Sequence, residues 1–261
     1  MDLKGKTALV TGSTSGIGLG IAQALAAQGA DLMLNGYGEP ASIEAIRADI
    51  ARTCGVRTLY SPADIGKPGQ VAAMVAEVQD KLGSLDILVN NAGVQFTAPI
   101  QDFPDEQWDR IIAINLSGAF YATRAAIPAM TARGWGRVIN IASAHGLVGS
   151  ADKVAYVAAK HGIIGMTKVA AIELANSGVT VNAICPGWVL TPLVQAQLDE
   201  RAARQGVTAE ALAESFVAEK QPMTKFTTPE QIGAFVVFLC SDAAATLTGA
   251  SLPIDGGWTA R

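Results

Sequence analysis

Hydrophobic and polar positions alternate along this chain in a regular rhythm of short and long segments. The short segments are apolar, rich in β-branched residues and bounded by turn residues, which is typical of strands; they are Thr7–Val10, Asp31–Asn35, Arg57–Tyr60, Ile87–Val89, Arg137–Ile141, Thr180–Ile184 and Ser251–Ile254. The longer segments carry Ala, Leu, Glu, Lys and Gln at helical spacing, and examples are Ile17–Gln28, Gly69–Leu82, Pro104–Arg124, Val154–Asn176 and Pro229–Leu239. Strands that alternate with helices predict an α/β fold, a doubly wound, Rossmann-like parallel sheet with helices on both faces.

One stretch interrupts this rhythm. Roughly forty residues separate the strand that ends at Ile184 from the helix that begins near Pro229, and they include a helical pair at Leu193–Arg204 and Ala209–Lys220. An insertion that leaves the carboxyl end of a strand lies where open α/β sheets bind ligands. We therefore expect one domain over residues 1–261, with residues 188–222 as a helical substrate lid; the alternative is a surface decoration.

Composition and charge narrow the classes of function. Half of the 261 residues are hydrophobic, the net charge is only −4, and no basic stripe occurs, so a nucleic-acid partner is not expected. The sequence has no long uncharged apolar stretch and begins without a signal-peptide pattern, which predicts a cytoplasmic protein with no membrane partner. Cys54, Cys185 and Cys240 are far apart and indicate small buried hydrophobic residues. With only two histidines and no cluster at ligand spacing, no metal is expected.

A glycine-rich turn follows the first predicted strand and opens the first predicted helix. Glycines let the backbone N–H groups approach a pyrophosphate, and the helix directs its positive end at that phosphate. The strand before and the helix after the turn favour this interpretation over a purely structural turn. The predicted cofactor contacts here are Gly12, Thr14, Ser15, Gly16, Ile17 and Gly18.

The spacing of these glycines belongs to a set of motifs that runs through the whole chain. The further motifs are Asn90-Asn91-Ala92-Gly93, Asn115, Ser143, Tyr156-Val157-Ala158-Ala159-Lys160 and Pro186-Gly187. In this order they resemble the short-chain dehydrogenase/reductase family. The resemblance implies a nicotinamide cofactor, with Lys160 on the nicotinamide ribose and Asn115 in a water-linked proton path. It also implies cofactor contacts from Asp64, Ile65, Asn91, Ala92, Gly93, Pro186, Gly187, Val189 and Thr191.

Two of these residues have a structural alternative. Asp64 resembles the family position that binds adenine, but it could instead cap the helix predicted over Gly66–Leu82. Thr191 resembles the position that holds the nicotinamide carboxamide, and it could also be the N-cap before Pro192.

The end of the second predicted strand indicates which nicotinamide cofactor is used. Enzymes that use NADP place an arginine or lysine here to meet the 2′-phosphate, and enzymes that use NAD often place an acidic residue. Neither Gly12–Gly18 nor Asn35–Glu39 contains a basic residue, which favours NAD. Because the common acid is also missing, the candidates for the ribose contact are Asn35, Gly36 and Tyr37.

Tyr156 and Lys160 are four residues apart on a predicted helix and therefore share one face. An ammonium group near a phenol favours the phenolate, so we expect Lys160 to lower the tyrosine pKa from about 10. Tyr156 is then the predicted general acid for ketone reduction and base for alcohol oxidation, with Ser143 bonded to the reacting oxygen. The alternative for an isolated Tyr-x-x-x-Lys pair is a solvated helix face.

Within the family, the resemblance narrows to bacterial D-3-hydroxybutyrate dehydrogenases. It rests on Ser143–Val148, Lys153, Ile184–Trp188, Lys220-Gln221-Pro222 and Asp255–Arg261. It implies NAD-dependent oxidation of (R)-3-hydroxybutyrate to acetoacetate and the reverse reduction. The implied substrate contacts, besides Ser143 and Tyr156, are Gln95, His145, Lys153 and Gln197 on the carboxylate and Trp188 on the methyl end. Phe96 and Leu190 depart from the subfamily, where a histidine and an arginine are typical.

Other functions stay open at this point. The chain could be another short-chain oxidoreductase, such as a 3-oxoacyl thioester reductase or a sugar dehydrogenase. It could also be a non-catalytic NAD-sensing protein, although a sensor does not need the set of Asn115, Ser143, Tyr156 and Lys160. The resemblance further implies a homotetramer, in which the tail Trp258–Arg261 is apolar enough at Trp258 to be buried.

Overall fold

The computed structural model describes residues 2–260, and seven parallel strands in this part of the chain form one sheet. The strands are β1 (Thr7–Val10), β2 (Asp31–Asn35), β3 (Thr58–Ser61), β4 (Ile87–Asn90), β5 (Gly136–Ile141), β6 (Val179–Pro186) and β7 (Ser251–Ile254). Their order in the sheet is β3-β2-β1-β4-β5-β6-β7, so the direction of winding reverses between β1 and β4. This arrangement confirms the predicted doubly wound fold, in which ligands bind beyond the carboxyl ends of the strands.

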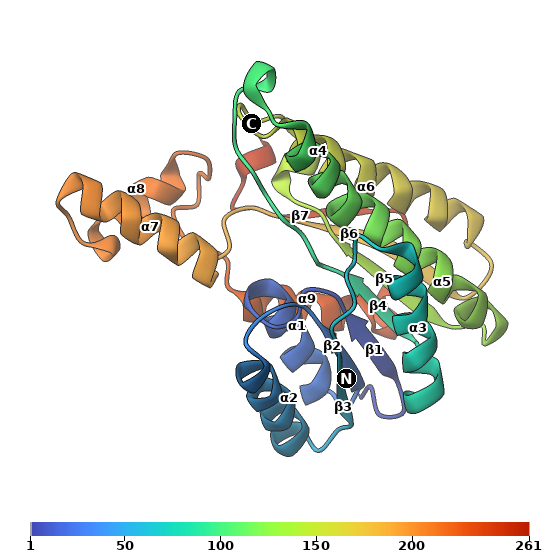
Figure 1. Cartoon of the computed structure of the whole chain (residues 1–261). Helices are drawn as coiled ribbons and strands as arrows, with labels where there is room; N and C mark the ends of the chain where they lie inside the picture. The colour runs from blue at the N-terminus through green and yellow to red at the C-terminus, as the bar shows by residue number, and fades with distance from the viewer. Residues whose placement is uncertain (1, 261) are drawn as a thin grey trace.

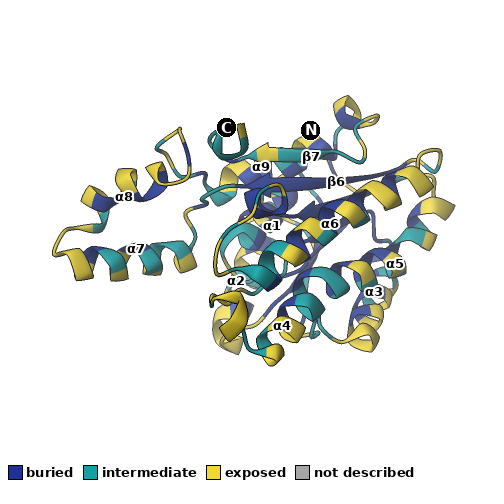
Figure 2. Ribbon diagram, turned by 90° about the horizontal axis from the view of Figure 1, so that it is seen from above, coloured by how far each residue is buried: buried dark blue, intermediate teal, exposed yellow. Residues whose placement is uncertain are grey.

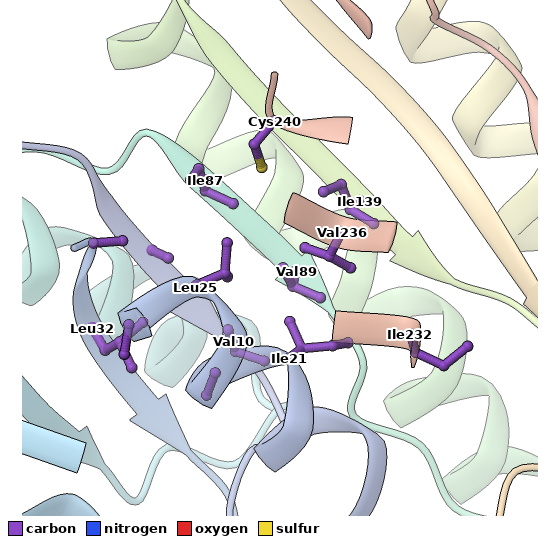
Figure 3. Close-up of a cluster of buried hydrophobic side chains, with 14 of the residues drawn as sticks. Val10, Ile21, Leu25, Leu32, Ile87, Val89, Ile139, Ile232, Val236 and Cys240 are labelled. Carbon is purple, nitrogen blue, oxygen red and sulfur yellow. The ribbon is translucent and has the colours of Figure 1, made fainter. Parts of the chain in front are cut away.

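Alternating side chains of the buried strands enter two different cores. Ala8 and Val10 of β1 pack with α1 (Gly16–Ala27) and α9 (Pro229–Leu239), and Figure 3 shows Val10 of this core beside Ile21 and Ile232. Leu9 points to the opposite core, which contains residues of α3 (Pro68–Leu82) and α5 (Gly118–Ala132). Figure 1 shows α1, α2 (Pro40–Cys54) and α9 on one face of the sheet and α3, α5 and α6 (Val154–Glu173) on the other.

The helix predicted over Pro104–Arg124 differs from the structure. It consists of α4 (Asp105–Ile112), one π-helical turn at Ala113–Ser117, and α5, which continues to Ala132. A π turn inserts a residue without a change in hydrophobic composition, so the periodicity of the sequence does not reveal it. Few residues of helix α2 are buried, so its apolar stripe is weak. The periodicity of the sequence therefore does not reveal this helix clearly.

The predicted helical pair is α7 (Pro192–Gln205) and α8 (Ala209–Ala218), and it projects from the body of the molecule (Figure 1). It has a small apolar cluster of its own, formed by Leu198, Ala202, Leu212, Phe216 and Val217. The outer faces of both helices are exposed (Figure 2). Over residues 2–260, no helix is both long and apolar enough to cross a membrane.

Candidate active site

The glycine turn is shaped by close contacts between β1, α1 and β4. Gly12 and Gly16 have positive φ angles of 63° and 54°, a conformation that glycine adopts without steric cost. A Cβ atom on Gly18 would lie 2.2 Å from the Gly12 carbonyl oxygen. Ser15 precedes the helix and makes no capping bond with its side chain. The first N–H groups of α1 therefore have no side-chain cap, which fits an anionic pyrophosphate.

Asn91 holds this turn in place from the end of β4. Its Nδ2 atom donates hydrogen bonds to the carbonyl oxygens of Thr11, at 2.9 Å, and Gly12, at 3.0 Å. The Ala92 N–H donates to the Thr11 hydroxyl at 3.0 Å. The amide of Asn91 is thus engaged within the protein. The predicted contacts of Asn91, Ala92 and Gly93 with a cofactor stay predictions and would use the Asn91 Oδ1 atom and the backbone groups not engaged in these bonds.

The side chain of Asn35 connects two strands at the edge of the sheet. It is 1% exposed, and Nδ2 donates to the carbonyl oxygens of Ser61 at 3.1 Å and Ala63 at 2.9 Å. These bonds tie the ends of β2 and β3 together. A ribose contact from Asn35 stays a prediction, and Gly36 and Tyr37 are the other candidates.

Tyr37 and Asp64 come together at the same edge of the sheet. The pKa of Tyr37 is raised by burial first and then by the neighbouring Asp64 carboxylate. The Thr14 hydroxyl donates to the Tyr37 carbonyl oxygen at 2.9 Å. Asp64 accepts from the Gly66 N–H at 2.9 Å, whereas the N-cap of α3 is Lys67, so the helix-cap alternative for Asp64 is wrong.

One cation lies within electrostatic range of Tyr37. It is Arg110 of α4, which lowers the Tyr37 pKa and so opposes the rise caused by burial and Asp64.

The remaining predicted cofactor residues line the carboxyl end of β6 or lie beneath the site. Ile65 is buried in the core shared with α3. Pro186 ends β6, and Val189 pairs with Thr227 in an isolated bridge. Thr191 is the N-cap of α7, and its methyl carbon would lie 3.3 Å from a Cβ atom on Gly16. The start of the α7–α8 insertion therefore lies directly beside the glycine turn.

Ser143, Tyr156 and Lys160 are brought together by the end of β5 and one face of α6. The Ser143 and Tyr156 hydroxyl groups share a hydrogen bond, and Ser143 Oγ also accepts from the His145 N–H at 3.1 Å. Lys160 is buried, and its Nζ atom donates to the Ile141 carbonyl oxygen at 2.7 Å. Such a hydroxyl pair at the carboxyl edge of a parallel sheet suits proton transfer to an oxygen held between the two groups.

Burial affects the protonation of this set. Burial raises the pKa of Tyr156, and the hydrogen bond from Ser143 opposes this rise. The Lys160 ammonium group is bonded to Ile141 and lies over the tyrosine ring, 5.5 Å from its centre, and its predicted lowering of the Tyr156 pKa stays a prediction. Burial also lowers the pKa of Lys160 to about 8.

Asn115 lies in the π-helical turn, a feature that is frequent at functional sites. Its Oδ1 accepts from the Val94 N–H at 2.8 Å, and its Nδ2 donates to the Val94 carbonyl oxygen at 2.9 Å. The side chain thus anchors the loop that leads to Gln95. Because both ends of the side-chain amide are bonded to Val94, a role of Asn115 in a proton path would use its main-chain groups.

An aromatic cluster lies beside Ser143 and Tyr156. The His145 ring meets Tyr156 edge-to-face, with 6.1 Å between the ring centres, and Trp258 at 4.9 Å. Trp188 lies 6.1 Å from Trp258 and 4.9 Å from Phe216 of α8. Trp258 therefore packs within its own chain but is only partly buried there, and its further burial in an assembly stays a prediction. Arg261 of the predicted tail lies outside the described residues.

Two buried polar atoms of this cluster have no hydrogen-bond partner in the structure, and two lysines lie within electrostatic range of it. These atoms are His145 Nε2 and Trp188 Nε1. Burial, followed by the charges of Lys153 and Lys220, lowers the pKa of His145 to about 4, so the imidazole is neutral near pH 7. Burial and Lys220 also lower the pKa of Lys153. Two cations in range of a neutral imidazole and an indole N–H make a site suited to an anion.

Gln95 and Gln197 have side chains that make no hydrogen bond within residues 2–260. Gln95 is exposed, and Gln197 lies partly exposed on α7. Both amide groups are therefore available to a ligand, and their contacts with a carboxylate stay predictions.

Gln221 is a residue whose importance the sequence did not reveal. Its side chain is fully buried; Oε1 accepts from the Trp188 N–H, and Nε2 donates to the Lys225 carbonyl oxygen at 3.2 Å. A Cβ atom on Gly187 or Gly256 would lie 2.3 or 2.7 Å from the Gln221 amide group. Gln221 thus joins the end of the insertion, the end of β6 and the C-terminal loop. The only signal in the sequence was its place in the Lys220-Gln221-Pro222 motif.

In the part of the chain that the structure describes, no three His, Cys, Asp or Glu side chains gather to form a possible metal site. The fold, the glycine turn and the Ser143–Tyr156–Lys160 set together define an oxidoreductase of the short-chain type.

Comparison with known proteins agrees with this class. A family model described as enoyl-(acyl carrier protein) reductase matches residues 12–259, and the structure superimposes on levodione reductase with a TM-score of 0.90, at 33% identity over 98% of each chain. The chain belongs to the short-chain dehydrogenase/reductase family, whose dehydrogenases use a nicotinamide cofactor.

Two relatives are similar over almost their whole length. The chain is 56% identical to D-beta-hydroxybutyrate dehydrogenase of Cupriavidus necator, over 99% of this chain and 100% of the relative. It is 55% identical to D-beta-hydroxybutyrate dehydrogenase of Rhizobium meliloti, over 98% and 99% of the two chains.

Proposed function

We propose that this chain catalyses the NAD-dependent oxidation of (R)-3-hydroxybutyrate to acetoacetate, and the reverse reduction. The observation that carries this proposal is the place of the buried, neutral His145, whose ring meets that of Tyr156 edge-to-face beside Ser143 and lies within electrostatic range of Lys153 and Lys220. The names of the two relatives with 55–56% identity support the same substrate.

Tyr156 is the proposed proton-transferring residue. In the oxidation it takes the proton of the substrate hydroxyl as a base, and in the reduction it returns a proton to the keto oxygen as an acid. Ser143 keeps the reacting oxygen beside Tyr156 through its own hydroxyl. Lys160 is proposed to hold the nicotinamide ribose, and a bound nicotinamide supplies the hydride acceptor or donor.

The carboxylate of the substrate is proposed to bind Lys153 and His145, with Trp188 against the methyl end. A carboxylate is costly to desolvate, so a pocket that accepts it must supply charge and donors. Residues 188–222 are proposed to act as a lid that brings Gln197 to the carboxylate, while Gln95 approaches from the loop after β4. The half-exposed α7 and the loop position of Gln95 are compatible with such movements.

The test compares the hydroxy acid with its methyl ester. We expect the ester to be a poor substrate, and Lys153→Ala to raise the KM for the acid by about 10-fold or more, the effect of one lost charge-assisted contact. Lys168→Ala, which changes an exposed lysine on the same helix, is the control. Equal efficiency with acid and ester in the wild-type protein would refute carboxylate recognition and favour a thioester or neutral alcohol.

NAD is the proposed cofactor because neither Gly12–Gly18 nor Asn35–Glu39 contains a cation for the 2′-phosphate. Tyr37→Arg is expected to improve the use of NADP, since Tyr37 is 67% exposed and can be replaced without loss of packing. Gly36 is unsuitable, because its φ is 152° and a Cβ atom would lie 2.6 Å from the Thr14 hydroxyl. Arg110→Ala shows whether that more distant cation contributes. Equal efficiency of the wild-type protein with both cofactors would contradict the proposal.

We also propose a homotetramer in the cytoplasm. Phe120 on α5 and Val169 and Ile172 on α6 are large exposed apolar residues, which a partner would cover. Light scattering is the measurement, and a stable monomer at micromolar concentration would refute the assembly.

A further inference from the structure

Asp152 has an unusual backbone conformation. Its φ of 62° makes it the only non-glycine residue with a positive φ over residues 2–260. The left-handed region is costly for most L-amino acids, and aspartate and asparagine tolerate it better than the others. The residue is exposed, so packing of its side chain does not explain the conformation. Such outliers are typical of sites where the backbone direction matters.

The position of Asp152 connects the two segments that carry the proposed carboxylate contacts. Its carbonyl oxygen accepts from the Ala98 N–H at 3.0 Å, and Ala98 belongs to the loop that begins beside Asn115 and contains Gln95. The next residue, Lys153, is the N-cap of α6, with φ −128° and ψ 33°. The chain is exposed at Ala151 and Asp152 and turns inward at Lys153, which is partly buried within electrostatic range of His145.

We propose that Asp152 is a positioning residue whose left-handed backbone directs Lys153 into the substrate pocket and holds the Gln95 loop against it. The inference rests on the proposed function insofar as Lys153 binds a carboxylate. An extended or right-handed residue at this position would redirect the chain before α6. The bond to Ala98 would then be lost, and the Lys153 ammonium would move away from His145.

The essential property is therefore the backbone conformation and not the carboxylate of Asp152. Four variants separate the effect of the backbone conformation from the effect of the carboxylate. Asp152→Gly and Asp152→Asn accept the left-handed conformation, whereas the β-branched side chain of Asp152→Val resists it. Ala151→Val introduces the same side chain at the neighbouring exposed position, where φ is not positive, and is the matched control.

The first readout is steady-state kinetics with the hydroxy acid, its methyl ester and NAD. We expect Asp152→Val to raise the KM for the acid about 10-fold, the order expected for strain at one residue, and to leave kcat and the KM for NAD unchanged. The KM for the ester should not change, which separates positioning of Lys153 from a general loss of structure. Asp152→Gly, Asp152→Asn and Ala151→Val should behave as the wild type. An equal rise in KM for Asp152→Gly and Asp152→Val would overturn the inference.

A second readout does not depend on any substrate. Labelling with an amine-reactive reagent across a pH series, followed by peptide mass spectrometry, gives the titration midpoint of Lys153. Its pKa is lowered in the pocket, so the midpoint should rise in Asp152→Val as the side chain leaves the pocket, with exposed Lys168 as internal reference. An unchanged midpoint would overturn the positioning role. A raised midpoint in a protein that does not oxidise the acid would refute the proposed substrate and leave the positioning role standing.

Discussion

The region around the glycine turn and the region around His145 and Trp188 differ in how their polar side chains are hydrogen-bonded. Around the glycine turn, polar side chains are bonded within the fold: Asn35 joins β2 to β3, Asn91 holds the carbonyl groups of the turn, and Thr14 bonds to Tyr37. Around the substrate pocket, His145 Nε2 and Trp188 Nε1 are buried without partners in the structure. In the first region most polar side chains are bonded within the fold, and in the second two side-chain nitrogen atoms are not.

The difference has an energetic meaning. A buried polar atom without a partner costs about 1–3 kcal/mol, and a carboxylate placed in the pocket would remove part of that cost. At the glycine turn the uncapped groups are the first backbone N–H groups of α1, so we expect this region to recognise a ligand by its shape and by these N–H groups. We therefore expect mutations in the cofactor half to damage stability and cofactor binding together. Mutations in the substrate half should change substrate affinity with little loss of stability.

The largest effect is expected at the border of the two regions. Tyr156→Phe removes the transferable proton, and we expect kcat to fall by about 10²–10⁴, the usual contribution of a general acid–base group. NAD binding and thermal stability should be preserved. Tyr121→Phe, on α5, is the control and should keep its turnover. A Tyr156→Phe enzyme with nearly the wild-type rate would remove Tyr156 from the mechanism.

Gly18→Ala tests the cofactor half. The new Cβ atom would lie 2.2 Å from the Gly12 carbonyl oxygen, so α1 must shift. We expect the Kd for NAD to rise by at least about 10-fold. We also expect Tm to fall, by roughly 2–4 °C for each kcal/mol of lost stability in a chain of this size. Gly69→Ala, where nothing lies within 4 Å, should leave both unchanged. Weaker NAD binding with an unchanged Tm would break the link between stability and binding in this region.

Phe216→Ala tests the α7–α8 insertion. Phe216 packs against Trp188 and lies in the cluster that holds α7 and α8 together. Truncation should loosen the pocket wall and raise the KM for the hydroxy acid by about 3–10-fold, in line with a partial loss of packing energy. Because the cluster is separate from the main cores, the KM for NAD should not change. If calorimetry of Phe216→Ala showed that the whole fold is destabilised together with the α7–α8 insertion, the insertion would not be independent of the main cores.

The last effect concerns His145 and pH, and it is the smallest near pH 7, where this histidine is neutral in both the folded and the unfolded chain. Its pKa is about 4 in the folded chain, against an ordinary value of 6.5, so between these values the unfolded chain binds a proton that the folded chain does not. This histidine therefore makes the free energy of unfolding fall as the pH drops from 6.5 to 4, by up to about 1.4 kcal/mol per pH unit. Denaturation by urea at several pH values should show a shallower decline for His145→Gln. The exposed His161→Gln variant should follow the wild type.

The sequence by itself determined the strands, most helices, the glycine turn and the family. Periodicity and spacing are local properties, and buried parallel strands and glycine turns each require a particular run of residues. For the same reason the Tyr156–Lys160 pair could be assigned to one helix face, and Ser143 to the end of a strand.

Only the tertiary structure decided which polar atoms are available to a ligand. Asn35 and Asn91 had the right positions for cofactor contacts, yet their amides are bonded to backbone groups far away in the sequence. Lys160 was expected to act on Tyr156, but its ammonium group bonds to Ile141. Gln221 and Trp258 join the pocket from segments distant along the chain. Burial and hydrogen-bond partners depend on what other segments bring to the same place, and local pattern does not contain that information.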